Sequence, residues 1–355
     1  MRWTSLLILS LLYTLTAAGQ SSSPTAPSLP ALPKNPAEIF AAAAPFYDFA
    51  SSTLKPWHMK VSYQLYDEKS EPTQTGVYEY WWASPDTYRS TWIRGGAEHT
   101  DWHVKGEHFY TETGASPQFF EWKLQSDLLT PLPDPEDLDT SHMRYDRETQ
   151  QVGGLKLPCV MIVPNMPSHG RVQTIPLGEF PTFCFDPNHP VLRAYYSFAG
   201  TAVVYNKLSL VQGRYLPREL TIFDGSRRVL TASVDGINGI AQNIPELNAN
   251  ESAKQAPKLE RVSIASGIAQ GQLIKQIRPH YPQDAKDARI DGKVVLKALI
   301  GRDGHIHELR VLEAPYPSLV AAAMWSVQQW EYKPYLLNGE PVEVDTTINV
   351  IFNIR

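Results

Sequence analysis

The sequence predicts an α+β protein with two domains: a β-rich antiparallel domain of half-barrel type and a small C-terminal β-β-α-β domain. Apolar and polar residues alternate over many short segments between residues 57 and 234, as in half-buried antiparallel strands. A single strong helical stripe follows near the C-terminus, between residues 318 and 330. With 355 residues the chain also exceeds one typical hydrophobic core, so two domains are expected.

Composition narrows the class of partner. The net charge is −5, whereas a nucleic-acid-binding protein needs a basic face, so no nucleic-acid partner is expected. Only 19% of the residues are charged and 29 are proline, which indicates a globular protein with Pro-rich connectors.

The N-terminus predicts export. Residues 1–19 carry Arg2, an apolar run over 6–15 and the small residues Thr16, Ala17 and Ala18, the pattern of a cleaved signal peptide. The alternative is a membrane anchor, but the apolar run is much shorter than the roughly 20 residues that a spanning helix needs. No cysteine follows the small residues, which argues against a lipid anchor there. We therefore expect a periplasmic protein, with peripheral attachment to the membrane as the alternative.

Residues 20–36 are a Pro/Ser-rich linker, and residues 37–242 form the predicted β-rich domain. It opens with a helix over 37–52 that Pro45 kinks or divides. Another short helix is predicted over 117–129. The predicted strands are 57–66, 76–82, 87–93, 100–105, 108–113, 160–163, 194–198, 202–210, 218–223 and 229–234. The polar residues 243–268 are the expected interdomain linker, and residues 269–355 are the C-terminal domain.

Two cysteines, Cys159 and Cys184, lie in strand-like segments of the predicted β-rich domain. Cysteine pairs in exported proteins usually form disulfides, so a structural bridge between them is favoured. The alternative is a redox or metal site, which no Cys-x-x-Cys motif or histidine cluster supports.

A metal site is the sharpest chemical alternative in the β-rich domain. His99, Asp101 and His103 fall on one face of a predicted strand, but a metal needs further convergent ligands, so a solvated face is favoured and no metal or cofactor is expected. His305 and His307 are likewise expected to be solvated. No motif of a hydrolase nucleophile, phosphate loop or zinc protease occurs, so an enzyme is not expected.

Aromatic residues gather in the first strands of the β-rich domain. They either line a cleft for a lipid or simply fill the core, and core filling is favoured on a sheet. The residues are Tyr78, Tyr80, Trp81, Trp82, Tyr88 and Trp92.

The C-terminal domain shows the clearest pattern. A strand over 293–300, the turn Gly301-Arg302-Asp303-Gly304 and a return strand over 306–313 form a hairpin. A helix follows over 318–329 with Ser318 as its cap. The turn Asn338-Gly339 then leads to a last strand over 346–354 with period-two alternation.

This order of residues resembles the C-terminal domain of the TonB energy-transducer family. The resemblance rests on Pro279-x-Tyr281-Pro282, Ile290-x-Gly292-x-Val294, Asp303-Gly304, the Ala321-Ala322-Ala323 helix and Trp330-x-Tyr332-x-Pro334. It implies that the domain grips an extended segment of an outer-membrane TonB-dependent transporter, or of another envelope protein, beside its last strand. The contact residues it implies are Arg278, Pro279, His280, Tyr281, Pro282, Asn349, Val350, Ile351, Phe352 and Asn353.

Two departures qualify this expectation. Arg278 stands where the best-known members have Gln, so peptide preference is expected to differ. The first apolar segment is short, lacks His and looks cleavable, which puts energy transduction from the inner membrane in doubt. For Pro279-x-Tyr281-Pro282 a purely structural role in setting the entry of the chain remains the alternative.

The β-rich domain more weakly resembles the LolA/LolB-like lipoprotein carriers. The matching pieces are Gly76-x-Tyr78-x-Tyr80, Ser84-Pro85-Asp86-x-Tyr88-Arg89, Val104-Lys105-Gly106, Tyr215-Leu216-Pro217-Arg218-Glu219 and the Asp224-Gly225 turn. The resemblance implies a half-barrel with a cleft for a lipid or acyl chain. The leading function is thus an envelope protein that docks transporter segments, associated with outer-membrane transport. The alternative is a lipid or lipoprotein carrier targeted by its C-terminal domain.

Overall fold

The computed structural model describes residues 29–133, 138, 143–164, 180–197, 201–256, 261–337 and 339–354. The expected signal peptide and most of the Pro/Ser-rich linker lie outside these residues. Within the described ranges, no helix has the length and apolar character needed to cross a bilayer.

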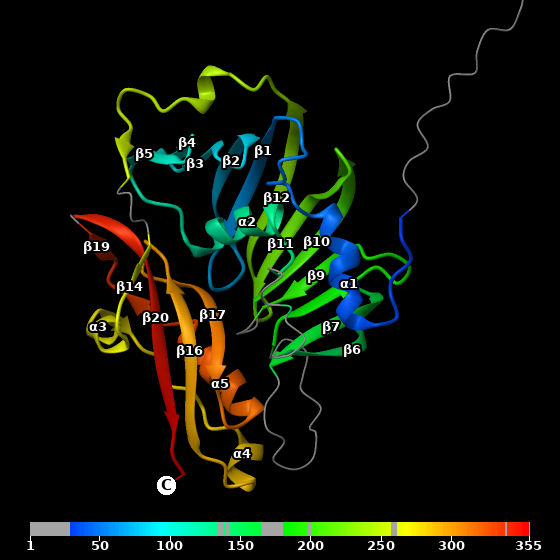
Figure 1. The fold of residues 1–355 in the computed structure, drawn as a ribbon, viewed down its shortest axis with the longest axis vertical. Coiled ribbons are helices and arrows are strands. Elements are labelled where there is room, and N and C mark those ends of the chain that lie inside the picture. The colour runs from blue at the N-terminus through cyan, green and yellow to red at the C-terminus, as the bar shows by residue number, and fades with distance from the viewer. Residues whose placement is uncertain are drawn as a thin grey trace, which may run out of the picture.

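The N-terminal domain is one curved, antiparallel sheet of 13 strands among the described residues, ordered β13-β5-β4-β3-β2-β1-β12-β11-β10-β9-β8-β7-β6 (Figure 1). The strands are β1 (Trp57–Tyr66), β2 (Pro72–Ser84), β3 (Thr87–Arg94), β4 (Ala97–Val104), β5 (Glu107–Thr113), β6 (Met143–Val152), β7 (Leu155–Pro164), β8 (Thr182–Phe185), β9 (Leu192–Tyr196), β10 (Thr201–Val211), β11 (Arg214–Asp224), β12 (Arg227–Gly239) and β13 (Lys254–Gln255). The pairing of β1 with β12 joins two meanders into one sheet.

Two helices cover one face of this sheet. Helix α1 (Pro36–Ala43) packs against β6, and α2 (Phe119–Leu129) packs against β11 and β12. Pro45 ends α1, and a separate 3₁₀ turn, η1 (Ala44–Phe46), follows, which confirms the predicted division. Their apolar residues share a core with β1, where Trp57, Met59 and Val61 are buried. The sheet face toward the helices therefore holds the main core.

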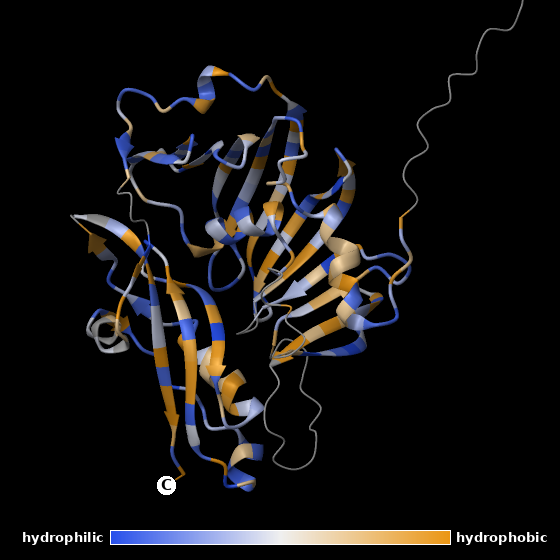
Figure 2. Cartoon of the chain, in the orientation of Figure 1, coloured by the Kyte–Doolittle hydropathy of each residue, from blue (hydrophilic) through white to orange (hydrophobic). Residues whose placement is uncertain are grey.

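The C-terminal domain has the predicted β-β-α-β order. Strands β16 (Gly292–Ile300), β17 (Ile306–Glu313) and β20 (Glu340–Phe352) form an antiparallel sheet under helix α5 (Pro317–Val327). Apolar residues recur along β16 and β20 as alternating bands (Figure 2). The predicted cap was wrong: Tyr316 is the N-cap and Pro317 opens the helix, which places Ser318 inside it.

Short elements complete this domain. The helices are α3 (Ser266–Gly271) and α4 (Gln283–Asp287), and the strands are β14 (Arg261–Ser263), β15 (Leu273–Lys275), β18 (Glu331–Tyr332) and β19 (Tyr335–Leu337). Strand β15 pairs with β18, and β19 pairs with the start of β20. Strand β14 pairs in parallel with residues 343–345 of β20.

The segment expected as an interdomain linker takes part in both sheets. After a 3₁₀ turn, η4 (Pro245–Leu247), β13 pairs with β5 of the N-terminal sheet, and β14 joins the C-terminal sheet. Leu29 and Leu32, at the end of the expected N-terminal linker, also pack against the main core. These connecting segments thus bury apolar side chains or pair as strands.

Candidate functional site

The outer side of β20, away from β16, is the candidate docking edge. Ile264 donates its backbone N–H to the carbonyl of Asp345 at 3.0 Å, so the backbone groups of Asp345 point away from β16. The register of β16 with β20 runs without a shift from Gly292↔Phe352 to Ile300↔Val344. The N–H and C=O groups of successive residues point alternately to the two sides of a regular strand. Those of Thr347, Asn349 and Ile351 therefore also point away from β16. No described residue pairs as a strand with residues 347–352 on that side, which we name the open edge.

The Tyr-Pro element is a pinned segment at the end of the domain where β16 begins and β20 ends. The carbonyl of Ile277 accepts two hydrogen bonds from the end of the helical region, from Ser326 Oγ at 2.5 Å and Trp330 Nε1 at 2.8 Å. Tyr281 donates its hydroxyl to the carbonyl of Ile290 at 2.6 Å. Its ring meets Phe352 edge-on, with 5.5 Å between the centroids. The element is therefore held in place by contacts within the domain.

Burial divides the predicted contact residues into two groups. The side chains of Arg278, His280, Asn349, Ile351 and Asn353 are exposed, and Ile351 is 65% exposed. Those of Pro282, Val350 and Phe352 are buried on the helix side, while Pro279 and Tyr281 belong to the pinned segment. Only the first group presents whole side chains to the surface, whereas the others take part in packing.

The Asp303-Gly304 turn has a steric cause. Gly304 has φ +80°, and a Cβ there would lie 2.0 Å from the carbonyl oxygen of Tyr332. Asp303 accepts the backbone N–H of His305 and pairs with His307 Nε2, both at 3.0 Å. Burial lowers the pKa of His307, but this pairing outweighs it and the pKa is raised. The expectation that His307 is merely solvated was therefore wrong.

A buried carboxylate orders the polar face of the first strands. Asp101 accepts hydrogen bonds from the rings of His99 and His108, each at 2.7 Å, while His103 stacks on Tyr88 and His108 instead. Burial opposes ionisation of Asp101, yet the two histidines outweigh it and hold its pKa below the usual range. The predicted solvated face is thus a buried network, and the described residues contain no group of three ligands suited to a metal.

The aromatic residues fill the core. Tyr78, Tyr80, Trp82 and Trp92 are each less than 5% exposed, and Tyr78 stacks on Trp92 with 4.1 Å between ring centroids. Trp81 lies on the opposite face, where its ring stacks on His58 and under the guanidinium of Arg89. These rings therefore fill the core, as favoured from the sequence, and do not line an open cleft.

The two domains meet at the turn between β16 and β17. Arg302 donates to Nδ1 of His108 at 3.4 Å, and Met161 and Val163 of β7 belong to the C-terminal core. A pocket of about 800 Å³ lies between the domains. Its walls mix aromatic and charged side chains, including Trp122, Asp127, Phe183, Lys297 and Arg310. Sequence reasoning missed this pocket because its residues come from both domains.

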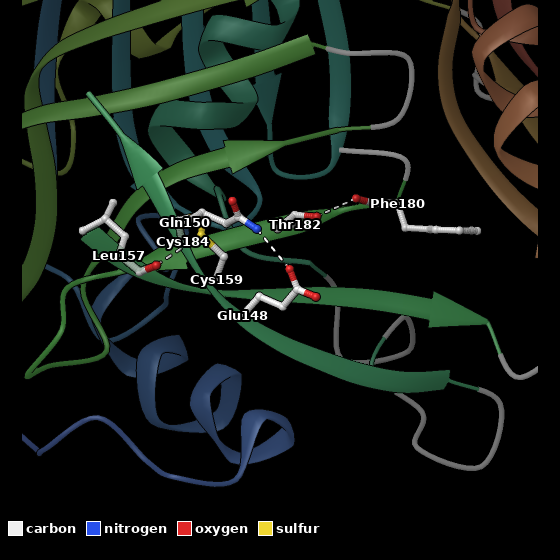
Figure 3. Close-up of a disulfide and its surroundings, with 7 residues drawn as sticks. All are labelled: Glu148, Gln150, Leu157, Cys159, Phe180, Thr182 and Cys184. Atoms are coloured by element: carbon white, nitrogen blue, oxygen red, sulfur yellow. Dashed lines mark hydrogen bonds between the residues drawn. A yellow bond between two sulfur atoms is a disulfide. The ribbon is translucent and has the colours of Figure 1, made fainter. Parts of the chain in front are cut away.

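Cys159 and Cys184 form a disulfide (Figure 3). They stand directly opposite each other on β7 and β8, whose described pairing extends only from Cys159↔Cys184 to Met161↔Thr182. Both sulfurs lie in the interior, at 1% and 0% exposure of their residues. The bridge therefore ties together a short stretch of ladder, and the predicted structural role is supported.

Comparison with known proteins identifies the C-terminal domain. Residues 277–354 match the family model of the Gram-negative bacterial TonB protein C-terminal domain, which confirms the resemblance read from the sequence. No curated protein matches the chain.

Three solved structures are distantly similar. A DUF1329 family protein from Desulfovibrio piger has 9% identity and a TM-score of 0.35, over 58% of this chain and 94% of that one. A putative outer membrane lipoprotein-sorting protein domain from Vibrio parahaemolyticus has 9% identity and a TM-score of 0.33, over 57% of this chain and 91% of that one. A LolA superfamily protein from Nitrosomonas europaea has 11% identity and a TM-score of 0.33, over 60% of this chain and 96% of that one.

Proposed function

We propose that this chain is a binding protein of the cell envelope whose C-terminal domain docks an extended segment of an outer-membrane transporter as an added strand. The incoming segment pairs with the open edge of β20. Exposed strand edges recruit other chains because their N–H and C=O groups lack partners. This mode of recognition requires no reacting group, in keeping with a binding role.

The observation that carries the proposal is the direction of the backbone along β20. Thr347, Asn349 and Ile351 present their N–H and C=O groups outward, as deduced from the Ile264–Asp345 bond. The buried residues Val350 and Phe352 hold the strand on the core, so the edge is rigid before binding. A preformed edge limits the conformational entropy lost by the protein on docking.

Binding to synthetic peptides tests the proposal. The probes are ten-residue peptides from the N-terminal periplasmic extensions of outer-membrane transporters of the source organism, titrated against the full mature chain by fluorescence anisotropy. Hydrogen exchange should then show new protection at Thr347, Asn349 and Ile351. Two versions of the best peptide, N-methylated at alternate residues in opposite phases, provide the matched control.

Strand addition predicts that one phase of N-methylation abolishes binding and the other leaves it nearly unchanged, because only alternate N–H groups face β20. Equal effects of both phases, or binding without protection of residues 347–352, would refute docking on the edge. Failure of every transporter peptide to bind would refute the partner class.

A lipid carrier is the second candidate, and the interdomain pocket favours it. Trp122, Ile162 and Phe183 give its N-terminal wall an apolar area that could take an acyl chain. Native mass spectrometry of the protein after incubation with envelope lipids checks this function. The Trp122→Asp variant, at a half-buried position of the pocket wall, should lose any bound lipid, and a mass equal to the bare chain in both proteins would exclude the carrier function.

A further inference from the structure

The docking edge of β20 is already partly occupied by the chain itself. Strand β14 pairs with residues 343–345, and Ile264 extends this contact by donating to Asp345 and accepting from Thr346 Oγ1 at 3.0 Å. Helix α3 begins directly afterwards and also contacts β20. The interdomain connector therefore fills the first part of the same side that the open edge continues.

Few polar interactions hold β14 in place, and its apolar contacts come from Val262 and the adjoining Ile264, which are half-buried against the C-terminal core. Its pairing with β20 covers residues 261–263, is parallel, and includes the exposed residues Arg261 and Ser263. One ion pair, between Arg261 and Glu343 at 3.1 Å, lies at the surface, where such pairs contribute little. Parallel pairing is also slightly less stable per residue than antiparallel pairing. Among the described residues, no strand pairs with residues 347–352 on this side of β20.

Building on the proposed function, we propose that β14 is an intrachain competitor of the docked segment. A partner of about six residues pairs with residues 347–352 without breaking the pairing of β14 with residues 343–345. A longer partner reaches residues 343–345 only by displacing β14, which also frees the connector between the domains. The length of the partner segment thus decides whether docking alters the link to the N-terminal domain.

Two variants of the full mature chain separate the states. Ile264→Pro removes the N–H that bonds Asp345 and leaves residues 347–352 unchanged. The double variant Ser263→Cys/Asp345→Cys joins residues that stand opposite each other, and its oxidised form locks β14 in place. The reduced form of the same protein is the matched control, since the native Cys159–Cys184 bridge is buried and resists mild reductant.

The probes are the best ten-residue transporter peptide and a version trimmed to the six residues that cover the open edge. Ile264→Pro should tighten binding of the long peptide about fivefold, the equivalent of one backbone hydrogen bond, and leave the short peptide unchanged. Oxidation of the double variant should lower its affinity for the long peptide to its affinity for the short peptide. In the unmodified chain, the long peptide should increase hydrogen exchange at residues 261–264.

Equal affinities of both peptides in every variant, with residues 261–264 still protected, would overturn the competition while leaving docking intact. No binding by any variant would instead count against the proposed function. Circular dichroism of Ile264→Pro excludes unfolding as the cause of any change, and the locked variant tests the same contact without a proline.

Discussion

Tyr281 and Phe352 pack edge to face, with an angle of 85° between their rings. In the sequence they lie near opposite ends of the C-terminal domain. This contact joins the Tyr-Pro element at the entry of the domain to the end of its last strand. Since edge-to-face pairs add roughly 0.5–1.5 kcal/mol to simple burial, the contact helps to close the domain.

Tyr281 offers a test of this closure. Tyr281→Phe keeps the ring and removes only the bond to the carbonyl of Ile290, so it should lower the free energy of unfolding by about 1 kcal/mol. Tyr281→Ala also removes the ring contact and should cost clearly more. Urea denaturation measures both. Equal losses for the two variants would show that the ring contributes nothing.

Proline substitutions test the direction of the backbone along β20. The N–H of Asn349 points outward, so Asn349→Pro should preserve the fold and weaken peptide binding more than about tenfold. Val350→Pro removes an N–H that faces β16 and should unfold the domain. Asn349→Ala is the matched control with normal affinity. Anisotropy measures binding and circular dichroism measures folding of the three proteins. If Val350→Pro were better folded than Asn349→Pro, the assigned direction of the two N–H groups would be contradicted.

The disulfide should contribute to stability. Replacing Cys159 and Cys184 together by Ala should lower the free energy of unfolding by roughly 2–4 kcal/mol, because the unfolded chain loses a closed loop. Non-reducing peptide mapping of the protein should recover the two residues in one linked fragment. Free thiols at both positions would rule out the bridge, and unchanged denaturation would rule out its structural role.

Asp101 should make stability depend on pH. The pKa of Asp101 is held below its usual 3.8, so its contribution is present above pH 3.8 and is lost as the pH falls further. Burial lowers the pKa of His99, but Asp101 outweighs it and raises that pKa above 6.5; this contribution is present below pH 6.5 and is lost at higher pH. Asp101→Ala should therefore cost about 3 kcal/mol between these values and less outside them.

Denaturation curves from about pH 3 to about pH 9 measure this difference, since they bracket both ordinary pKa values. Glu107→Ala, which removes an exposed carboxylate from the neighbouring strand, is the control and should give a difference near zero throughout. A cost of Asp101→Ala that stays constant across the whole range would contradict the charged network.

Gly106 and Gly304 are turn glycines with nearly equal φ. Replacing each by Ala distinguishes the loss of stability caused by a steric clash from the loss caused by backbone strain. A Cβ added at Gly106, where φ is +81°, would meet nothing within 4 Å, so Gly106→Ala should cost only about 1 kcal/mol of conformational strain. Gly304→Ala adds the collision with the carbonyl of Tyr332 and should cost about 3 kcal/mol. Thermal denaturation compares them, and similar losses would mean that the Tyr332 strand shifts freely.

Local sequence determined the elements of this protein. Alternation of apolar residues predicted the bounds of β1, residues 57–66, and the order β16, β17, α5 and β20, because one face of each must be buried. Strand β6 was not predicted, since it is an edge strand with charged residues such as Arg144 and Asp146 and lacks a clear alternation.

Tertiary structure decided what the elements do together. Short strands such as β14 carry too few residues for a periodic signal, so only their pairing shows that the connector covers part of β20. In the same way, His108 rather than His103 completes the Asp101 network, because the neighbouring strand brings it within 2.7 Å. Sequence periodicity reports which face of a strand is buried, whereas the backbone edge that binds a partner depends on which strand lies beside it.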